Sequence, residues 1–257
     1  MPVEPALPLS GHIVLVTGAS SGIGRAIALA CARSGADVAI TYRANRAGAD
    51  ETAAAIASLG RRAAVRALDL ASDDHIRALG PWLCDTFGRV DAWINNAGAD
   101  IVTPGPDSMS ALEKLDLLLA VDLRGTILAS WEAVSLMKTQ DRGGVVINMS
   151  WDHVTQGMQG TNPQMYAAVK GGIMSFSKGL ARSVAPKVRV NILAPGWIET
   201  AFGEGVDQQV YRAVADSTPM KRWGRPEDVA GAAVYLASPA AAFLTGQTIN
   251  VGGGTVM

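Results

Sequence analysis

Short runs of β-branched and apolar residues alternate with longer, Ala-rich amphipathic segments along nearly the whole chain. This alternation is typical of strand–helix–strand units, in which parallel strands form one sheet with helices on both faces. The predicted strands are His12–Thr17, Val38–Tyr42, Ala63–Leu68, Ala92–Asn95, Val145–Met149, Val188–Leu193 and Thr248–Val251. The predicted helices are Ile23–Ser34, Arg46–Leu59, Asp73–Phe87, Ala111–Lys138, Met165–Val184 and Glu227–Ala237. The fold class is therefore α/β, a doubly wound parallel sheet of about seven strands.

No repeat, low-complexity block or linker divides the chain, so we expect residues 1–257 to form a single domain. Residues 1–10 contain three prolines and no basic residue, which indicates a loose N-terminal leader and not a secretory signal. The last 29 residues, from Val229, carry no charge. Pro239 and several glycines interrupt them, so we reject a membrane-spanning helix and expect burial in the core or against another subunit.

The charge is balanced, with 22 basic and 23 acidic residues and a formal net charge of -1. This balance gives no reason to expect a nucleic-acid or membrane partner. Cys31 and Cys84 lie far apart, with no CxxC pattern or His-rich neighbourhood. A disulfide framework or a metal site is therefore not expected, and the reducing cytoplasm is the simplest location.

A glycine-rich turn, Gly18-Ala19-Ser20-Ser21-Gly22-Ile23-Gly24, joins the first predicted strand to the first predicted helix. Glycines there permit a tight turn and a close approach of the backbone to a diphosphate, which the free N–H groups of the helix N-terminus then bind. The spacing is GxxxGxG and differs from the general dinucleotide fingerprint GxGxxG. In this strand–turn–helix position it predicts a Rossmann-like nucleotide site.

The end of the second strand bears on the choice of cofactor. NAD-specific folds place there an acidic residue that binds the adenosine ribose, but this chain reads Thr41-Tyr42-Arg43-Ala44-Asn45. Arg43 is suited to a 2′-phosphate, which favours NADP(H) over NAD(H), although it is also explained as a solvated strand-end residue. Asp69, after the third strand, is a candidate adenine contact or a turn residue.

Tyr166 and Lys170 stand at positions i and i+4 of a predicted helix, so their side chains share one face. A free phenol has a pKa of about 10, too high for easy proton transfer at neutral pH. We expect the Lys170 ammonium to lower the pKa of Tyr166 and make the phenol a usable acid or base.

Several motifs in order resemble the short-chain dehydrogenase/reductase family from Ile13 to Gly254. They are Thr17 to Gly24, Asp69-Leu70, Asn95-Asn96-Ala97-Gly98, Tyr166-x-x-x-Lys170, Arg189-Val190-Asn191, Pro195-Gly196-Trp197-Ile198-Glu199-Thr200, Leu244-Thr245-Gly246-Gln247 and Gly252-Gly253-Gly254. The resemblance implies a nicotinamide cofactor, hydride exchange with a carbonyl or alcohol substrate, and a homotetramer. It also implies that residues 201–225 form a substrate lid.

The same resemblance assigns roles by position. Tyr166 would be the general acid for carbonyl reduction, and Lys170 would hold the nicotinamide ribose. The implied cofactor contacts are Gly18, Ser20, Ser21, Gly22, Ile23, Arg43, Asp69, Leu70, Asn95, Ala97, Gly98, Tyr166, Lys170, Pro195, Gly196, Ile198 and Thr200.

Two positions depart from the family pattern. Asp122 stands where a helix asparagine often completes the catalytic set, and an aspartate has no amide N–H to donate. The serine that the family places after the strand is also displaced. When this chain is aligned with the family pattern at Asn148, Trp151 stands at the serine position. We predict that Ser150 supplies the hydroxyl that polarises the carbonyl, with a protonated Asp152, or no group at all, as the alternatives.

The substrate is less constrained than the cofactor. His153 is read as a loop residue or a substrate contact, and Trp151, Trp197 and Trp223 as pocket or core-edge residues. Few cationic groups occur in residues 201–225 before Lys221, which favours an uncharged, moderately apolar ketone or alcohol. The competing hypothesis is a cofactor-binding protein with little turnover that acts as a sensor or assembly partner.

Overall fold

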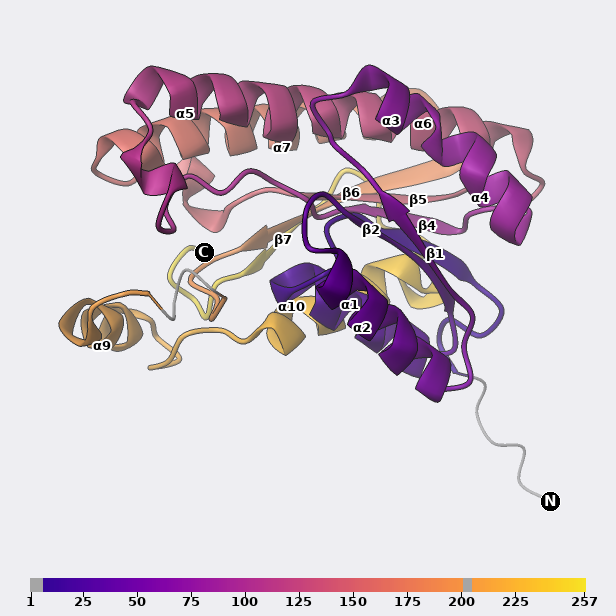
Figure 1. Cartoon of the computed structure of the whole chain (residues 1–257), viewed down its shortest axis with the longest axis horizontal. Helices are drawn as coiled ribbons and strands as arrows, with labels where there is room; N and C mark the ends of the chain where they lie inside the picture. The colour runs from indigo at the N-terminus through magenta and orange to yellow at the C-terminus, as the bar shows by residue number, and fades with distance from the viewer. Residues whose placement is uncertain (1–6, 201–204) are drawn as a thin grey trace.

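The structure is a computed structural model, and it describes residues 7–200 and 205–257. Residues 1–6 of the expected leader and 201–204 of the expected lid lie outside the described residues. The described part of the lid contains one helix, α9 (Gln208–Ser217), which lies at one end of the molecule (Figure 1).

All seven predicted strands are present and form one parallel sheet. The strands are β1 (Ile13–Val16), β2 (Asp37–Tyr42), β3 (Ala63–Ala67), β4 (Ala92–Asn95), β5 (Gly144–Met149), β6 (Val188–Pro195) and β7 (Thr248–Val251). Their order is β3-β2-β1-β4-β5-β6-β7, so the chain reverses its direction of growth between β1 and β4. In doubly wound sheets a ligand site lies at the carboxyl ends of the strands beside this reversal.

Helices cover both faces of the sheet (Figure 1). One layer contains α1 (Gly22–Arg33), α2 (Arg46–Ser58) and α10 (Pro226–Ala237). The other contains α3 (Asp73–Arg77), α4 (Leu79–Phe87), α5 (Ala111–Leu118), α6 (Gly125–Thr139) and α7 (Thr161–Val184). Short helical turns are η1 (Pro106–Ser108), η3 (Asp152–Thr155) and η4 (Pro239–Ala241). The predicted α/β fold with two helical layers is confirmed.

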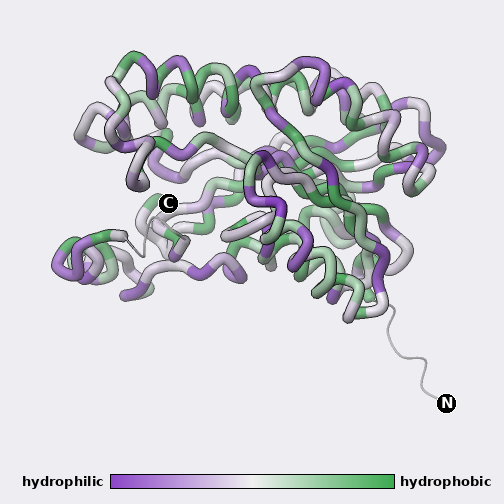
Figure 2. The backbone as a smooth tube through the Cα atoms, in the orientation of Figure 1, coloured by the Kyte–Doolittle hydropathy of each residue, from purple (hydrophilic) through white to green (hydrophobic). Residues whose placement is uncertain are grey.

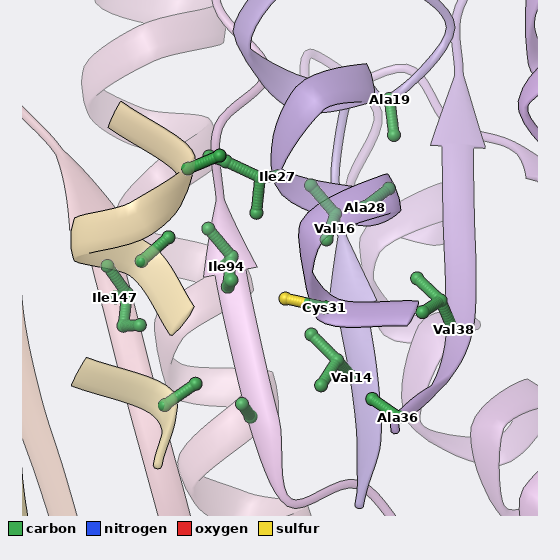
Figure 3. Close-up of a cluster of buried hydrophobic side chains, with 14 of the residues drawn as sticks. Val14, Val16, Ala19, Ile27, Ala28, Cys31, Ala36, Val38, Ile94 and Ile147 are labelled. Atoms are coloured by element: carbon green, nitrogen blue, oxygen red, sulfur yellow. The ribbon is translucent and has the colours of Figure 1, made fainter. Parts of the chain in front are cut away.

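Two clusters of buried apolar residues hold these layers against the sheet. On one face, Ile27 and Cys31 of α1 pack over Val14 and Val16 of β1, which are all essentially inaccessible to solvent (Figure 3). On the other face, Trp93 of β4 is fully buried among residues of α4, α6 and α7. A central strand such as β1 is therefore apolar on both sides, whereas the helices alternate apolar and polar residues along their turns (Figure 2).

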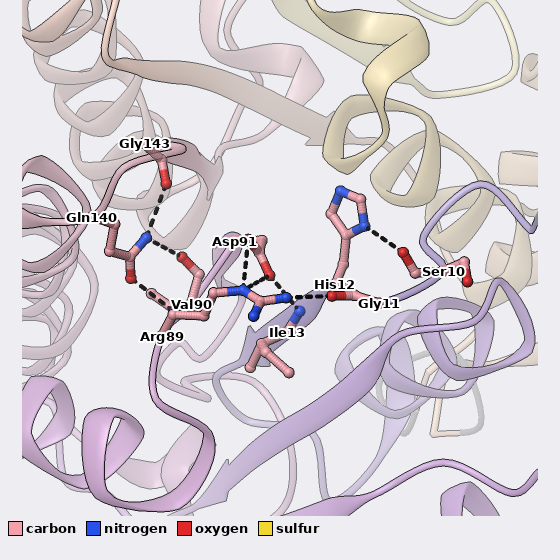
Figure 4. A network of polar contacts seen from close by, with 9 residues as sticks. All are labelled: Ser10, Gly11, His12, Ile13, Arg89, Val90, Asp91, Gln140 and Gly143. Atoms are coloured by element: carbon pink, nitrogen blue, oxygen red, sulfur yellow. Dashed lines mark hydrogen bonds and ion pairs between the residues drawn. The ribbon is translucent and has the colours of Figure 1, made fainter.

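Polar contacts tie together the amino ends of the central strands, at the edge opposite the expected site (Figure 4). Arg89 Nε donates to both carboxylate oxygens of Asp91, and Asp91 Oδ2 accepts the N–H of Ile13 at 2.7 Å. Gln140 accepts the N–H of Val90 at 2.9 Å through Oε1 and donates to its carbonyl oxygen at 2.8 Å through Nε2. These contacts fix β1, β4 and β5 relative to one another.

The segment predicted as one helix from Ala111 to Lys138 contains an unexpected π-helical stretch. Between α5 and α6 the chain forms a π-helix, η2 (Leu119–Arg124), without leaving the helical path. Gly125 follows it and packs so closely on Leu70 that a Cβ would overlap. Widened turns of this kind occur most often at functional sites, and η2 contains Asp122.

The uncharged C-terminal segment contains α10, η4 and β7. Within residues 7–200 and 205–257, no helix combines the length and apolarity needed to cross a bilayer. The expectation that this segment forms no membrane-spanning helix agrees with its division into two short helices and a strand.

Candidate active site

The glycine-rich turn lies between β1 and α1, where the sequence predicts a phosphate loop. Gly18 and Gly22 have φ angles of 66° and 52°, which a residue with a Cβ rarely adopts. The Ser21 side chain makes no capping hydrogen bond, and the first turn of α1 contains no acidic residue. The N–H groups at this helix terminus are therefore available to an anion.

The loop is held by the ends of the two neighbouring strands. Thr17 Oγ1 accepts the N–H groups of Asn96 and Ala97, both at 3.0 Å, and Asn96 Nδ2 donates to the Thr17 carbonyl at 2.9 Å. A Cβ on Gly18 would stand 2.9 Å from the Ala97 Cα, and one on Gly24 would overlap Gly18 O. This preformed loop, in which glycines let the backbone approach closely, fits the diphosphate of a dinucleotide.

Other predicted cofactor residues lie around this loop. Thr200 approaches Gly22, since a Cβ on that glycine would lie 3.7 Å from Thr200 Cγ2. Arg43 is exposed directly after β2 and makes no ion pair or hydrogen bond with the residues that the structure describes. Asp69 is partly exposed and accepts the N–H of Ala71 at 2.9 Å, which is a turn contact.

Asn95, an implied cofactor contact, has a side chain that is buried among other protein groups. Its Oδ1 accepts the indole N–H of Trp93 at 2.8 Å, and its Nδ2 donates to Asn148 Oδ1 at 2.8 Å and Ser130 Oγ at 3.1 Å. The side chain is 2% exposed and its amide is satisfied within the protein. Asn95 therefore joins β4 to β5 and α6 through a buried polar network.

Tyr166, Lys170 and Asp122 form the polar centre of the site. Helix α7 places Tyr166 and Lys170 on one face, and Lys170 Nζ lies 5.2 Å from the centroid of the Tyr166 ring. The same ammonium forms an ion pair of 2.8 Å with Asp122 Oδ2, and both side chains are buried. Asp122 Oδ1 accepts the N–H of Ala99 at 2.6 Å, so η2 is fixed to the loop after β4.

The charges of this group set the pKa of the phenol. Desolvation raises the pKa of Tyr166 above its usual value, Lys170 lowers it, and Asp122 raises it. Lys170 acts on the pKa of Tyr166 in the expected direction, but burial and Asp122 outweigh the ammonium, so the pKa is not brought below its usual value. Desolvation also opposes the charge of Lys170, but Asp122 and Tyr166 together hold its pKa above the usual range.

The sequence marks Asp122 as a departure from the family pattern but does not show that it is the partner of Lys170. The signal was an acidic residue at a buried helix position, where a carboxylate needs a cation. Gly98 makes room for it, since a Cβ on Gly98 would lie 3.0 Å from Asp122 Oδ2.

Three polar side chains follow β5 and point in different directions: Ser150, Asp152 and His153. Ser150 is buried, and its hydroxyl donates to the carbonyl of Lys170 at 2.8 Å. Asp152 is 1% exposed, and its Oδ2 lies where a Cβ on Gly196 or Gly252 would stand. Its Oδ1 is 2.6 Å from Nδ1 of His153. Burial raises the pKa of Asp152, while the hydrogen bond with His153 acts in the opposite direction.

A row of aromatic rings leads away from the phenol. Trp151 meets Tyr166 edge to face, with ring centroids 5.4 Å apart, and stacks on His153 at 5.0 Å. Trp197 lies 6.2 Å from His153 and 5.4 Å from Trp223. Trp223 is 2% exposed and belongs to the core edge, whereas Trp151 and Trp197 remain partly exposed. The region beside Tyr166 is therefore lined by flat apolar surfaces.

Within the described residues, no group of three or more His, Cys, Asp or Glu side chains is arranged to hold a metal ion. Fold and site together define a class, an α/β oxidoreductase in which a glycine-rich loop follows β1 and a Tyr–Lys pair lies on one face of α7.

Comparison with known proteins agrees with this class. The family model described as enoyl-(acyl carrier protein) reductase matches residues 18–256. A 3-oxoacyl-[acyl-carrier-protein] reductase of Synechocystis is 36% identical, over 97% of this chain and 98% of the relative. A putative short-chain alcohol dehydrogenase from Sinorhizobium meliloti 1021 has 35% identity and a TM-score of 0.87, covering 98% of both chains. A 7α-hydroxysteroid dehydrogenase complexed with NADH and 7-oxo glycochenodeoxycholic acid has 29% identity and a TM-score of 0.88, over 100% of this chain and 98% of that one.

The chain belongs to the short-chain dehydrogenase/reductase family. It is an oxidoreductase of that family, whose members use nicotinamide cofactors and small-molecule substrates. The predicted family, fold class and enzyme class are confirmed.

Proposed function

We propose that this protein reduces a ketone, or oxidises the corresponding secondary alcohol, with NADP(H) and with Tyr166 as general acid and base. The supporting observation is the Tyr166–Lys170–Asp122 group at the sheet edge that also carries the phosphate loop. A protein that only bound the cofactor would have no use for a buried ammonium beside a phenol.

When bound, the reduced nicotinamide supplies a hydride to the carbonyl carbon. Tyr166 gives its hydroxyl proton to the carbonyl oxygen, and the phenolate regains a proton from solvent. In alcohol oxidation the Tyr166 phenolate takes the hydroxyl proton instead. Lys170 keeps its positive charge because Asp122 is 2.8 Å away, and its remaining N–H donors serve the phenol and the ribose hydroxyls.

Ser150 as the group that polarises the carbonyl stays a prediction. Its hydroxyl hydrogen is engaged by the Lys170 carbonyl, so this role requires Ser150 to exchange that bond for one to the substrate. A single hydroxyl hydrogen cannot fully serve two acceptors.

We propose NADP(H) as the preferred cofactor because Arg43 is the charged residue directly after β2. The neighbouring basic residues Arg25 and Arg46 are paired with Glu51 and Asp50, whereas Arg43 is exposed and unpaired among the described residues. A guanidinium in this position can bind a 2′-phosphate with two parallel hydrogen bonds.

The substrate we propose is an uncharged, moderately apolar ketone or alcohol. Trp151 and Trp197 provide flat surfaces next to Tyr166, and flat apolar molecules gain most from such surfaces. The 7α-hydroxysteroid dehydrogenase to which this chain is similar was solved with 7-oxo glycochenodeoxycholic acid, which carries a ketone on a bulky apolar ring system and a separate carboxyl group.

We also propose a cytoplasmic homotetramer. A groove along η2 and α6 is lined by Leu119, Leu123, Ile127 and Trp131, of which Leu119 is 41% exposed and Trp131 is 54% exposed. Exposed apolar grooves of this type mark protein contacts. Light scattering should give four times the mass of the chain, and a monomer would contradict the proposal.

The experiment that tests the function is a deuterium-transfer screen. The protein is incubated with NADPH or NADH that carries deuterium at both C4 positions and with ketones, quinones, oxoacyl thioesters and sugars, and the products are analysed by mass spectrometry. We expect one deuterium at the new carbinol carbon of an apolar ketone. Tight cofactor binding without transfer to any substrate would instead support a binding protein with little turnover.

A further inference from the structure

The Asp152–His153 pair is a polar group of the site for which the mechanism above has no use. It rests on η3, directly after the strand end at which a polarising group is expected. The side chain of Asp152 is inaccessible to solvent, and that of His153 is 12% exposed. Burying a carboxylate costs several kcal/mol unless a partner compensates it. A pair of this kind therefore needs an explanation.

The chain makes room for the carboxylate from the opposite side. Gly196, after β6, and Gly252, after β7, both face Asp152 Oδ2, and a Cβ on either glycine would overlap that oxygen. Oδ2 has no hydrogen-bond partner among the described residues, so His153 is the group that satisfies this carboxyl. The contact of 2.6 Å between Oδ1 and Nδ1 also fixes the orientation of the imidazole ring.

The location of the protons follows from charge balance. When the net charge of Asp152 and His153 together is zero, the two side chains share two protons. One proton lies between Oδ1 and Nδ1, bonded to either atom, and the second is on Nε2. A proton on Oδ2 would have no acceptor. In the alternative form, the Asp152 carboxylate keeps its negative charge, the single imidazole proton is on Nδ1, and Nε2 has no proton. Burial disfavours this net negative charge, because no second cation contacts Asp152 among the described residues. Burial therefore favours the form in which Nε2 of His153 is a hydrogen-bond donor.

Trp151 connects the ring that carries this donor to the catalytic phenol. His153 stacks on one face of Trp151, and the same indole contacts Tyr166. A carbonyl oxygen that accepts from both Tyr166 and His153 needs the two donor atoms about 4 to 5 Å apart. His153 and Tyr166 each contact the indole of Trp151, and the inference places their donor atoms at this separation. Meanwhile the hydroxyl of Ser150 is engaged by the Lys170 carbonyl.

From these observations we infer that Nε2–H of His153 is the second hydrogen-bond donor to the reacting carbonyl oxygen, in place of a serine hydroxyl. Asp152 is a positioning residue that acts through His153, because it fixes the tautomer and the ring orientation. This inference rests on the proposed ketone reduction and adds a residue to its mechanism. A donor aimed at the carbonyl oxygen acts mainly on kcat, since the oxygen gains negative charge in the transition state.

Two variants separate the donor from its structural role. In His153→Asn the amide nitrogen stands as many bonds from Cα as Nδ1 does, so it can still serve Asp152 but cannot reach the substrate. In His153→Gln the amide nitrogen stands as many bonds away as Nε2 does, so the donor to the substrate is retained. Both variants lose the stacking on Trp151 equally, and each is therefore the other's control.

We expect His153→Asn to lower kcat for ketone reduction about 100-fold, and His153→Gln to lower it no more than about 10-fold. The dissociation constant of NADPH, measured by fluorescence titration, should change less than about threefold in both variants, because neither touches the phosphate loop. Equal kcat losses in the two variants would overturn the inference, since the stacked ring and not the donor would then matter. Full kcat in His153→Asn would overturn it as well.

Ser150→Ala and Tyr166→Phe complete the experiment. If Ser150→Ala loses more kcat than His153→Asn, the serine polarises the carbonyl and the inference about His153 is wrong. If Tyr166→Phe keeps its kcat, the proposed function itself fails, whatever the His153 variants do. A loss in Tyr166→Phe together with equal losses in the His153 pair rejects the role of His153 alone.

Discussion

Replacing Asp122 with asparagine tests how the buried charges tune Tyr166. Asn at this position keeps an oxygen for the N–H of Ala99 and removes the negative charge that lies 2.8 Å from Lys170 Nζ. The ammonium then acts on the phenol without a compensating anion. Because Asp122 raises the pKa of Tyr166, its loss lowers that pKa.

The size of the effect follows from Coulomb's law. Two unit charges about 6 Å apart interact by about 3 kcal/mol at an effective dielectric constant of about 20. Tyr166 is partly exposed, so solvent screens part of this interaction, and we expect a downward shift of its pKa that is smaller than this limit.

The assay is the pH dependence of kcat for alcohol oxidation, which requires the phenolate form of Tyr166. A lower phenol pKa moves the rising limb of this profile to lower pH in Asp122→Asn. Asp141→Asn is the matched control, because it removes the same charge from an exposed site between α6 and β5, beyond the amino end of the sheet. A rising limb that stays in place, or moves to higher pH, in Asp122→Asn would refute the electrostatic reasoning.

Two further predictions concern the cofactor. Arg43→Ala should raise the KM for NADPH about 10-fold or more and leave the KM for NADH nearly unchanged, because only the 2′-phosphate contact is lost; equal effects in parallel kinetic assays would remove the assignment. Gly24→Ala should weaken binding of both cofactors at least 10-fold in fluorescence titrations, because its Cβ would overlap the carbonyl of Gly18 and displace the phosphate loop. Unchanged affinity would show that the loop is not the diphosphate site.

Local sequence was sufficient for the sheet and the phosphate loop. Strands such as Ala92–Asn95 are recognisable because both faces are buried, which leaves a short apolar run between turn residues. The loop is recognisable because glycines are required at the positive φ angles of Gly18 and Gly22. These features depend on neighbouring residues alone, so the sequence determines them directly.

The π-helical stretch could not be predicted from periodicity. An amphipathic pattern from Ala111 to Lys138 fits one long α-helix, and a single wide turn within it leaves the pattern almost unchanged. Yet this turn places Asp122 next to Gly98 and Lys170. The three residues belong to segments that are far apart in sequence. The ion pair therefore depends on tertiary packing.

The directions of the side chains that follow β5 could not be predicted from the sequence either. Spacing placed Ser150, Asp152 and His153 near the site but could not show which of them faces the substrate. The hydroxyl of Ser150 meets a carbonyl of α7, and Asp152 fits beside two glycines from other strands. Such contacts join residues twenty or more positions apart, and no local pattern encodes them.

The most direct test of the account is Tyr166→Phe, with turnover and cofactor affinity measured on the same preparation. The substitution removes only the hydroxyl, while the ring that contacts Trp151 and Lys170 remains. We predict a loss of at least about 100-fold in kcat, with the dissociation constant of NADPH within about threefold of the unmodified protein. Full turnover in this variant would contradict the claim that the phenol transfers the proton.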